Sequence, residues 1–245
     1  MLVVDRDDTL ASIARSLGVP IKSLMAWNHL KTERVKRGQK LFYVAPVLRA
    51  ESVGRPGAGG LVSGSRMPLE GRGYVMSKDR TRVFATPQTI RYVKDCLGRY
   101  RSQYPKGPPI SLGDFSARNG GPVPPHVSHQ SGRDVDIGFL TRPPQSRGVL
   151  DRVATPQNLD VEKQWFVLKC FLDNPDAHSI FIEWSVSDTL KAYVEKIYRR
   201  RPSVKQHYLR LFPSSELRIV KADSAHRTHM HVRFKCPKGS KQCVP

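Results

Sequence analysis

Apolar and polar positions form four short patterns within the first 46 residues. The apolar run at 2–4 predicts a strand, and apolar residues at helical spacing over 10–17 predict a helix that Gly18 ends. A second short helix is expected over 20–28, and a second strand over 40–44. The order strand, helix, helix, strand indicates a small module of its own.

Beyond residue 65, helical and alternating patterns follow one another. Helices are expected from Thr86–Pro87 to Tyr104, after the capping residue Asp160, and over 187–201. Strands are expected over 110–115, 134–140, 178–184, 217–220 and 229–236. This mixture predicts an α+β fold, with a central, mostly antiparallel sheet and flanking helices.

A glycine-rich stretch lies between these two parts. Residues 47–64 contain little periodicity, which is typical of a linker, and the portion from Gly59 is expected to be a loop of the following domain. The predicted organisation is therefore a module at 1–46, a linker at 47–64 and a larger domain at 65–245.

Composition and charge narrow the class of protein. The chain has 245 residues, of which 39% are hydrophobic and 8% aromatic, enough for a packed core. No apolar run approaches the roughly 18–20 residues of a membrane-spanning helix, and no signal peptide stands at the start. The net charge of +20 predicts a negatively charged partner, and nucleic acid, anionic lipid and a carboxylate-rich cell wall all qualify.

The four cysteines divide into two pairs by their surroundings. Cys236 and Cys243 bracket a turn-rich segment, which favours a local disulfide and an oxidising compartment. Cys96 and Cys170 fall in helical patterns and are interpreted as buried thiols, with mutual pairing as the alternative. A four-cysteine zinc site is not favoured because no CxxC pair occurs.

Two histidine clusters carry the candidate chemistry. His126 and His129 stand in the first cluster, and the second comprises His226, His229 and His231. Residues two apart on a strand share a face, so His229 and His231 point the same way. Asp136 lies on the polar face of its own strand, seven residues after His129. Imidazoles and a carboxylate with one open position are typical of catalytic zinc; ordinary core or surface histidines are the alternative.

The first 46 residues resemble a LysM domain. The resemblance rests on Asp8-Thr9-Leu10, Ile13-Ala14, Gly18, Leu24, Asn28 and Gly38-Gln39-Lys40-Leu41. It implies binding of N-acetylglucosamine-containing glycans such as peptidoglycan. The groove residues it implies are Asp8, Thr9, Leu10, Trp27 and Asn28. The alternative is that these side chains only build the small core.

The larger domain resembles the LAS metallopeptidases, and more fully the penicillin-insensitive murein endopeptidases. The matching motifs are Gly113-Asp114, Asn119-Gly120-Gly121, His126-x-Ser128-His129-Gln130-x-Gly132-x-Asp134-Val135-Asp136-Ile137 and His226-x-x-His229-Met230-His231-Val232-Arg233-x-x-Cys236-Pro237. The similarity runs from about Gly54 to Cys243 and includes the cysteine pair at 236 and 243.

That resemblance assigns a role to each histidine of the clusters. It makes His129, Asp136 and His231 ligands of a zinc ion, with His126 as a further metal or metal-adjacent position of unplaced role. One zinc per chain is expected, because no histidine follows the first cluster before residue 178.

The same resemblance places proton transfer in the second cluster. His229 would assist the transition state, and His226 would be the general base where relatives of the wider group use a glutamate. No His-Glu-x-x-His motif occurs in the sequence.

The implied reaction is hydrolysis of the D-alanyl–meso-diaminopimelate cross-link of peptidoglycan, in the periplasm or cell envelope, after export by a signal outside this chain. No Ser-x-x-Lys motif supports an acyl-enzyme, so insensitivity to β-lactams is expected. The alternatives are a D,D- or L,D-carboxypeptidase or dipeptidase of the same fold, or a catalytically inactive LysM wall-binding protein. No nucleic-acid recognition motif is present, and the pattern does not indicate an oligomeric state.

Overall fold

The computed structural model describes all residues except 1, 5–7, 18, 44–49, 77–80 and 214–217. The chain forms two compact units, Met1–Arg49 and Ala50–Pro245. The expected helix stop at Gly18 and the expected strand end at Val44 lie outside the described residues. No helix in the described part is long and apolar enough to cross a membrane.

The first unit has the expected order of elements. Its strands β1 (Leu2–Val3) and β2 (Lys40–Leu41) pair antiparallel around α1 (Leu10–Leu17) and α2 (Ile21–Trp27). Its buried core is built by Val4, Leu10, Ile13, Ala14, Val19, Leu24 and Leu41. The helical spacing in the sequence therefore gives the small unit a hydrophobic core of its own.

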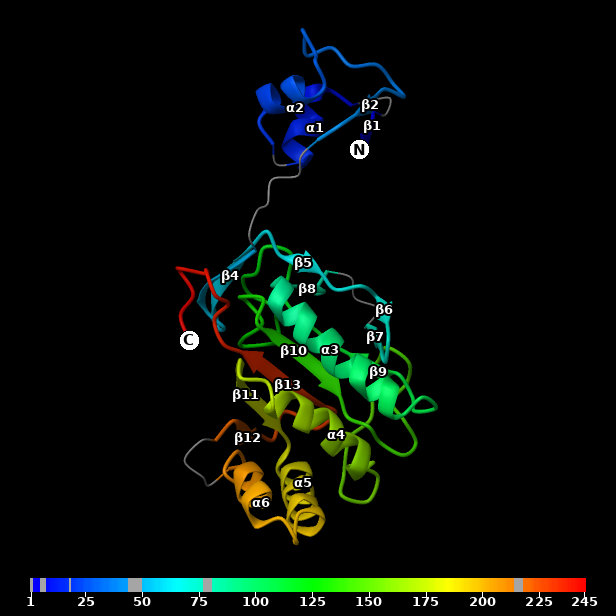
Figure 1. Cartoon of the computed structure of the whole chain (residues 1–245), viewed down its shortest axis with the longest axis vertical. Coiled ribbons are helices and arrows are strands. Elements are labelled where there is room, and N and C mark those ends of the chain that lie inside the picture. The colour runs from blue at the N-terminus through cyan, green and yellow to red at the C-terminus, as the bar shows by residue number, and fades with distance from the viewer. Residues whose placement is uncertain (1, 5–7, 18, 44–49, 77–80, 214–217) are drawn as a thin grey trace. The chain divides into compact units, whose positions relative to one another are not determined.

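The second unit is built on a seven-stranded sheet, which Figure 1 shows running through its centre. The strands lie in the order β12 (Val220–Ala222), β11 (Ala177–Ile182), β13 (His229–Phe234), β10 (Asp134–Gly138), β9 (Ile110–Leu112), β7 (Tyr74–Met76) and β6 (Glu70–Gly71). Pairing is antiparallel except between β11 and β12 and between β7 and β9. The expected α+β class with an antiparallel-rich sheet is confirmed.

Helices cover the apolar face of this sheet. In Figure 1, α3 (Pro87–Gln103) and α4 (Val161–Leu172) cross in front of the strands, and α5 (Trp184–Ile197) and α6 (Pro202–Leu209) lie beyond β12. Val135, Val232 and Ile180, from three central strands, are fully buried in the shared core. The expected helix caps are present too, since Thr86 and Asp160 accept backbone hydrogen bonds at the starts of α3 and α4.

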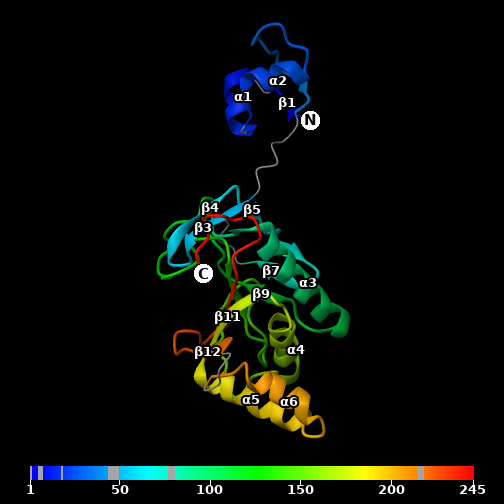
Figure 2. The same ribbon diagram turned by 60° about the vertical axis from the view of Figure 1, so that its left-hand side comes forward.

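The predicted linker is wrong for residues 51–62. They form the antiparallel strands β3 (Glu51–Arg55) and β4 (Ala58–Val62) of the second unit. Gly54 has φ 64°, and the C-terminal tail runs alongside it. Gly54 N donates a hydrogen bond to Gln242 O at 2.8 Å. Figures 1 and 2 both show the C-terminus beside this hairpin. Glycine removes the alternating side chains that reveal a strand in a sequence, and the long-range partner is invisible there.

Two helix boundaries also differ from the expected ones. The strand expected over 178–184 ends at Ile182, because the carboxylate of Glu183 accepts from Ser185 N and Val186 N and starts α5 at Trp184. The helix expected to reach 201 ends at Ile197, and Pro202 then opens α6, which the sequence analysis missed.

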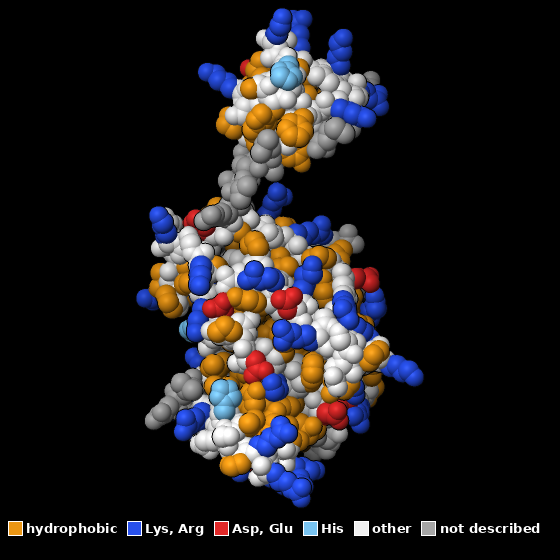
Figure 3. Space-filling model, in the orientation of Figure 1, with side chains coloured by type: hydrophobic (Ala, Val, Ile, Leu, Met, Phe, Trp, Pro, Cys, Tyr) orange, Lys and Arg blue, Asp and Glu red, His pale blue; other side chains and the backbone are white. Residues whose placement is uncertain are grey.

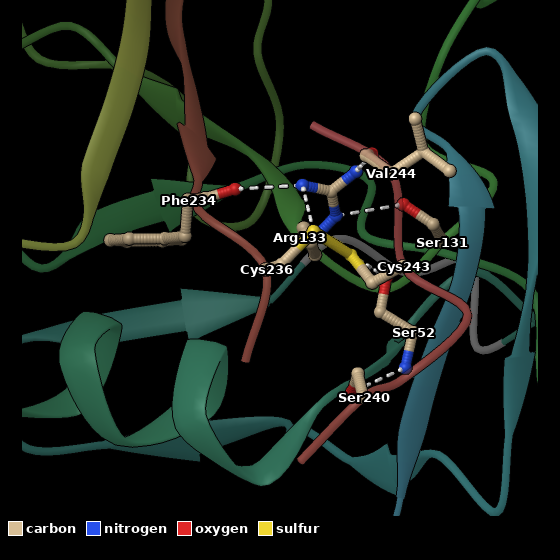
Figure 4. Close-up of a disulfide and its surroundings, with 8 residues drawn as sticks. All are labelled: Ser52, Ser131, Arg133, Phe234, Cys236, Ser240, Cys243 and Val244. Carbon is tan, nitrogen blue, oxygen red and sulfur yellow. Dashed lines mark hydrogen bonds between the residues drawn. A yellow bond between two sulfur atoms is a disulfide. The ribbon is translucent and has the colours of Figure 1, made fainter. Parts of the chain in front are cut away.

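Both pairs of cysteines form disulfides. Cys96–Cys170 joins α3 to α4, so the interpretation of buried thiols is wrong and its alternative holds. The expected bond Cys236–Cys243 closes the C-terminal tail. Figure 4 shows Arg133 beside this bond, fully buried, with hydrogen bonds to the carbonyls of Phe234 and Val244. The guanidinium thus ties the start of β10 to the tail.

Candidate metal centre

The histidine clusters meet on the polar face of the sheet. On β10 and β13, Asp136 lies directly opposite His231, and Gly138 lies opposite His229. The intervening residues Met230 and Val232 are fully buried on the other face, as the strand alternation predicted. The sheet register therefore brings Asp136 and His231 together although they are 95 positions apart in the sequence.

His129 reaches this face from the loop before β10. Its backbone is left-handed, with φ 65°, an uncommon conformation for a residue other than glycine. Gly120 lies in the same loop and packs so tightly that an added Cβ would approach Gln130 O at 2.1 Å. The fully buried ring of His129 donates from Nδ1 to Phe115 O at 2.8 Å, because a carbonyl can only accept. This bond leaves Nε2 free to act as a ligand.

Asp134 fixes the other ring in the same way. Its Oδ1 lies 2.7 Å from His231 Nε2 and 2.7 Å from Arg233 Nε, so both nitrogens donate to this carboxylate. His231 Nδ1 is then the remaining ligand atom, and it lies 3.2 Å from His129 Nε2. These two nitrogens face each other at hydrogen-bonding distance, so a proton can lie between them in the metal-free protein, and a metal ion can take its place.

The Asp136 carboxylate completes the convergence. Its Oδ1 lies 3.2 Å from His129 Nε2 and 3.4 Å from His231 Nδ1, yet it is buried without a hydrogen-bond partner among the described residues. Burial opposes its ionisation, but the adjacent imidazoles outweigh burial and hold the pKa of Asp136 well below its usual range. Conversely, burial lowers the pKa of His129, but the Asp136 charge outweighs it and raises the pKa to about 9. The donor set fits a divalent metal ion such as zinc.

His126 stands at the edge of this group. Its Nε2 is 3.0 Å from Asp114 Oδ2 and 3.9 Å from Asp136 Oδ2. His126, His129 and Asp136 each offer a ligand atom within 4.8 Å of the others, so they form a possible metal site as well. Arg82 Nη1 also contacts Asp114, at 3.0 Å. His126 thus has two roles open to it, binding the metal or bonding to Asp114.

The two remaining histidines line the approach to Asp136. His229 Nε2 lies 3.6 Å from Asp136 Oδ1, and His226 Nδ1 lies 3.3 Å from Asp223 Oδ1 without the alignment of a hydrogen bond. Burial lowers the pKa of His226, and it lowers that of His229 to about 4. Both rings are therefore neutral at pH 7 in the metal-free protein and can accept a proton.

A cleft of about 530 Å³ opens over these rings, and its lining includes His126, Phe181, His226 and Arg233. Phe181 and Asp223 carry no functional signal in the sequence, and Arg233 and Asp134 stand out there only as members of a family motif. Strand alternation also indicates Arg233 and Asp134, because they continue the polar faces of strands already recognised.

The five residues expected to bind glycan differ in solvent exposure in the first unit. Leu10 is 1% exposed and belongs to the core. The side chain of Asn28 binds the backbone of Leu24 and Phe42, which fixes the end of α2 to the segment after β2. Thr9 is exposed, and Asp8 and Trp27 are half-buried, so these three remain candidates for contact with a ligand.

Fold and site together define an α+β protein with a buried histidine–aspartate centre suited to a metal ion. The sequence model of the penicillin-insensitive murein endopeptidase family matches residues 52–245, and that of the LysM domain matches residues 2–42. The chain belongs to the penicillin-insensitive murein endopeptidase family and carries an N-terminal LysM domain.

Individual relatives agree with this assignment. The penicillin-insensitive murein endopeptidase of Klebsiella pneumoniae (strain 342) is 32% identical over 206 residues, covering 79% of this chain and 69% of that protein. The protein of the same name from Escherichia coli O1:K1 / APEC is 31% identical over 201 residues, with the same two shares covered.

Proposed function

We propose that this protein is a zinc-dependent murein endopeptidase that hydrolyses D-alanyl–meso-diaminopimelate cross-links of peptidoglycan. The observation that carries the proposal is the convergence of His129 Nε2, His231 Nδ1 and Asp136 Oδ1 within 3.2–3.4 Å of one another. Each histidine has its other nitrogen occupied by a fixed acceptor, as metal-binding imidazoles do. The same proposal gives residues 65–245 the fold of the LAS metallopeptidases.

His129, Asp136 and His231 would hold the metal, one ion per chain, with His126 beside it. Zinc in such a site supplies a Lewis acid that polarises the scissile carbonyl and acidifies water. His229 and His226 are neutral rings at the mouth of the site, and they are positioned to take a proton from the attacking water and return it to the leaving amine. Asp134 keeps His231 in the tautomer that this arrangement requires.

The LysM unit would bring the enzyme to its polymeric substrate by binding glycan strands, through residues such as Thr9 and Trp27. The wall carries many carboxylates, so the net charge of +20 attracts the protein to this polymer. Two disulfides support a location outside the cytoplasm, in the periplasm or cell envelope.

Replacing one ligand tests the proposal directly. His231→Ala and Asp136→Ala should each lose bound zinc and at least about 100-fold in cleavage of cross-linked muropeptide dimers, since the open site needs all three ligands. His207→Ala, on the exposed side of α6, is the matched control and should retain both.

The reaction products distinguish the proposed endopeptidase from a carboxypeptidase or dipeptidase. Mass spectrometry should show a dimer converted to two monomers. Release of terminal alanine would instead identify a carboxypeptidase, and retention of zinc and activity in His231→Ala would overturn the ligand assignment.

A further inference from the structure

The polar face of the sheet continues beyond the metal cluster to a second group of cations. Lys221 on β12 pairs with Phe181 on β11, and Phe181 pairs with His231 on β13. Side chains in register across neighbouring strands share a face, so Lys221, Phe181 and His231 stand in one row. With a strand spacing of about 4.8 Å, Lys221 starts about 10 Å from His231.

Arg233 stands in the next row, two residues along β13 from His231, or about 7 Å. Its Nε donates to Asp134 Oδ1, which fixes the planar guanidinium at its inner edge. Neither terminal nitrogen of Arg233 has a hydrogen-bond partner among the described residues. The side chain is 18% exposed and lines the cleft of about 530 Å³, so these nitrogens are accessible to a ligand.

The ring of Phe181 lies between the two cations. Its centroid is 5.6 Å from Lys221 Nζ and 5.6 Å from Arg233 Cζ, and the ring stacks on His226 at 5.6 Å. Of the nearby carboxylates, Asp134 already bonds to His231 and Arg233, and Asp223 faces His226. Phe181 is therefore an apolar platform on this wall of the cleft with two cations beside it, and Lys221 has no carboxylate partner among the described residues.

We propose that Arg233 and Lys221 form a carboxylate-binding subsite that selects peptides with a free carboxylate close to the scissile bond. The inference rests on the proposed function. Diaminopimelate has two carboxyl groups, so a peptide cross-linked through its side-chain amine keeps one free beside the cleaved amide. The separation of about 7 Å between His231 and Arg233 corresponds to two residues of extended peptide. A diaminopimelate residue bound at the metal cluster therefore has its carboxyl groups within reach of Arg233. Arginine suits this task because its fork binds a carboxylate through two hydrogen bonds.

Arg233 also neutralises Asp134, so an Arg233 variant alone cannot distinguish a structural role from ligand recognition. A Lys221 variant tests recognition by itself, because Lys221 is exposed and no hydrogen bond or ion pair joins it to the metal cluster among the described residues. Lys221→Met removes one charge of the subsite and keeps the aliphatic stem over Phe181. Lys94→Met makes the same change of charge on α3, which packs on the opposite, apolar face of the sheet.

Binding and turnover are measured with the zinc-loaded full chain. The ligand for calorimetry is the diaminopimelate-containing tripeptide product, in its acid form and as the diaminopimelyl dicarboxamide. The substrates for kinetics are the cross-linked dimers in the same two forms. Wild-type protein and Lys94→Met should bind the acid about 10- to 100-fold more tightly than the amide. Lys221→Met should reduce this ratio about 3- to 10-fold, and Arg233→Gln should bring it close to one.

Equal binding of acid and amide by the wild-type protein would overturn the subsite. So would Lys221→Met if it weakened both ligands alike, because that is the result of a purely structural role. Cleavage of both dimers with equal KM would also refute the subsite while leaving the proposed function intact. Discrimination in calorimetry with no cleavage of either dimer would support the subsite and refute the proposed reaction.

Discussion

Asp134 and Asp136 differ by two positions on one strand face, and the structure gives them different tasks. Asp136 points an oxygen without a hydrogen-bond partner at two imidazoles. Asp134 accepts from His231 and Arg233, and these partners outweigh burial and hold its pKa well below the usual range. In the proposed metal centre, Asp136 would bind the ion directly, and Asp134 would orient His231 as a ligand of that ion.

This division predicts the effect of Asp134→Asn. The amide oxygen can still accept from His231, but the negative charge that raises the basicity of the ring is lost. We expect zinc affinity to fall about 10- to 100-fold with the fold retained. Competition with a chromogenic chelator measures the affinity, and Asp188→Asn on the exposed side of α5 is the control. Unchanged affinity would mean that Asp134 does not support a metal ligand.

At the scale of elements, the start of α4 depends on one carboxylate. Asp160 caps the helix through Lys163 N and also bonds to the side chains of Lys163 and Arg142. Burial raises its pKa, but these hydrogen bonds outweigh burial and leave it lowered. A carboxylate with a depressed pKa stabilises the fold above its unfolded pKa, near 4, and loses that contribution as pH falls from there through its lower folded pKa.

Asp160→Asn keeps the capping oxygen and removes the charge, so it tests this contribution. At pH 6 the variant should be about 1 kcal/mol less stable than the wild type, and the difference should be smaller at pH 3, which lies below the unfolded pKa and closer to the lowered pKa of the folded carboxyl. Denaturant unfolding at the two pH values measures it. A difference that is equal at both pH values would contradict the assigned ion pairs.

The two disulfides should differ in their effect on stability. The Cys96–Cys170 bond closes a separation of 74 residues between α3 and α4, whereas Cys236–Cys243 closes 7. By loop-closure entropy, Cys96→Ser/Cys170→Ser should cost about 4 kcal/mol and Cys236→Ser/Cys243→Ser about 2 kcal/mol. Guanidinium unfolding of the two double variants gives the comparison, and equal losses would show that native-state contacts outweigh chain entropy.

At the scale of the whole molecule, each of the two units has a hydrophobic core of its own. Figure 3 shows Lys and Arg side chains scattered over the visible face rather than gathered in one patch. Dispersed cations of this kind favour diffuse attraction of the visible face to an anionic polymer.

Separate cores predict separable roles. A chain of residues 50–245 should cleave soluble muropeptide dimers with kcat/KM within about twofold of the full chain, because the metal cluster lies wholly inside that unit. Its retention on insoluble sacculi in a pelleting assay should fall by about 10-fold or more, since two linked binding sites gain from effective concentration. Undiminished pelleting would show that the LysM unit does not anchor the enzyme.

The local sequence pattern by itself determined which side chains face the core and where some helices begin. Strand alternation placed His229 and His231 on one face and Met230 and Val232 in the core, and a side-chain cap with proline marked the start of α3. These features depend on neighbours two to four residues away, so the sequence by itself determines them. The predicted metal cluster rested on such spacing and on family resemblance, and ligand atoms of His129, Asp136 and His231 lie within 3.2–3.4 Å of one another.

Only the tertiary structure decided the rest. The hairpin β3–β4 is hydrogen-bonded to the C-terminal tail at Gly54, and α5 begins early because Glu183 caps it. The pairing of Cys96 with Cys170, and the row that joins Lys221, Phe181 and His231, depend on sheet register and helix packing across long separations. Periodicity fixes which face a side chain takes, but only the packed fold fixes which partners share that face.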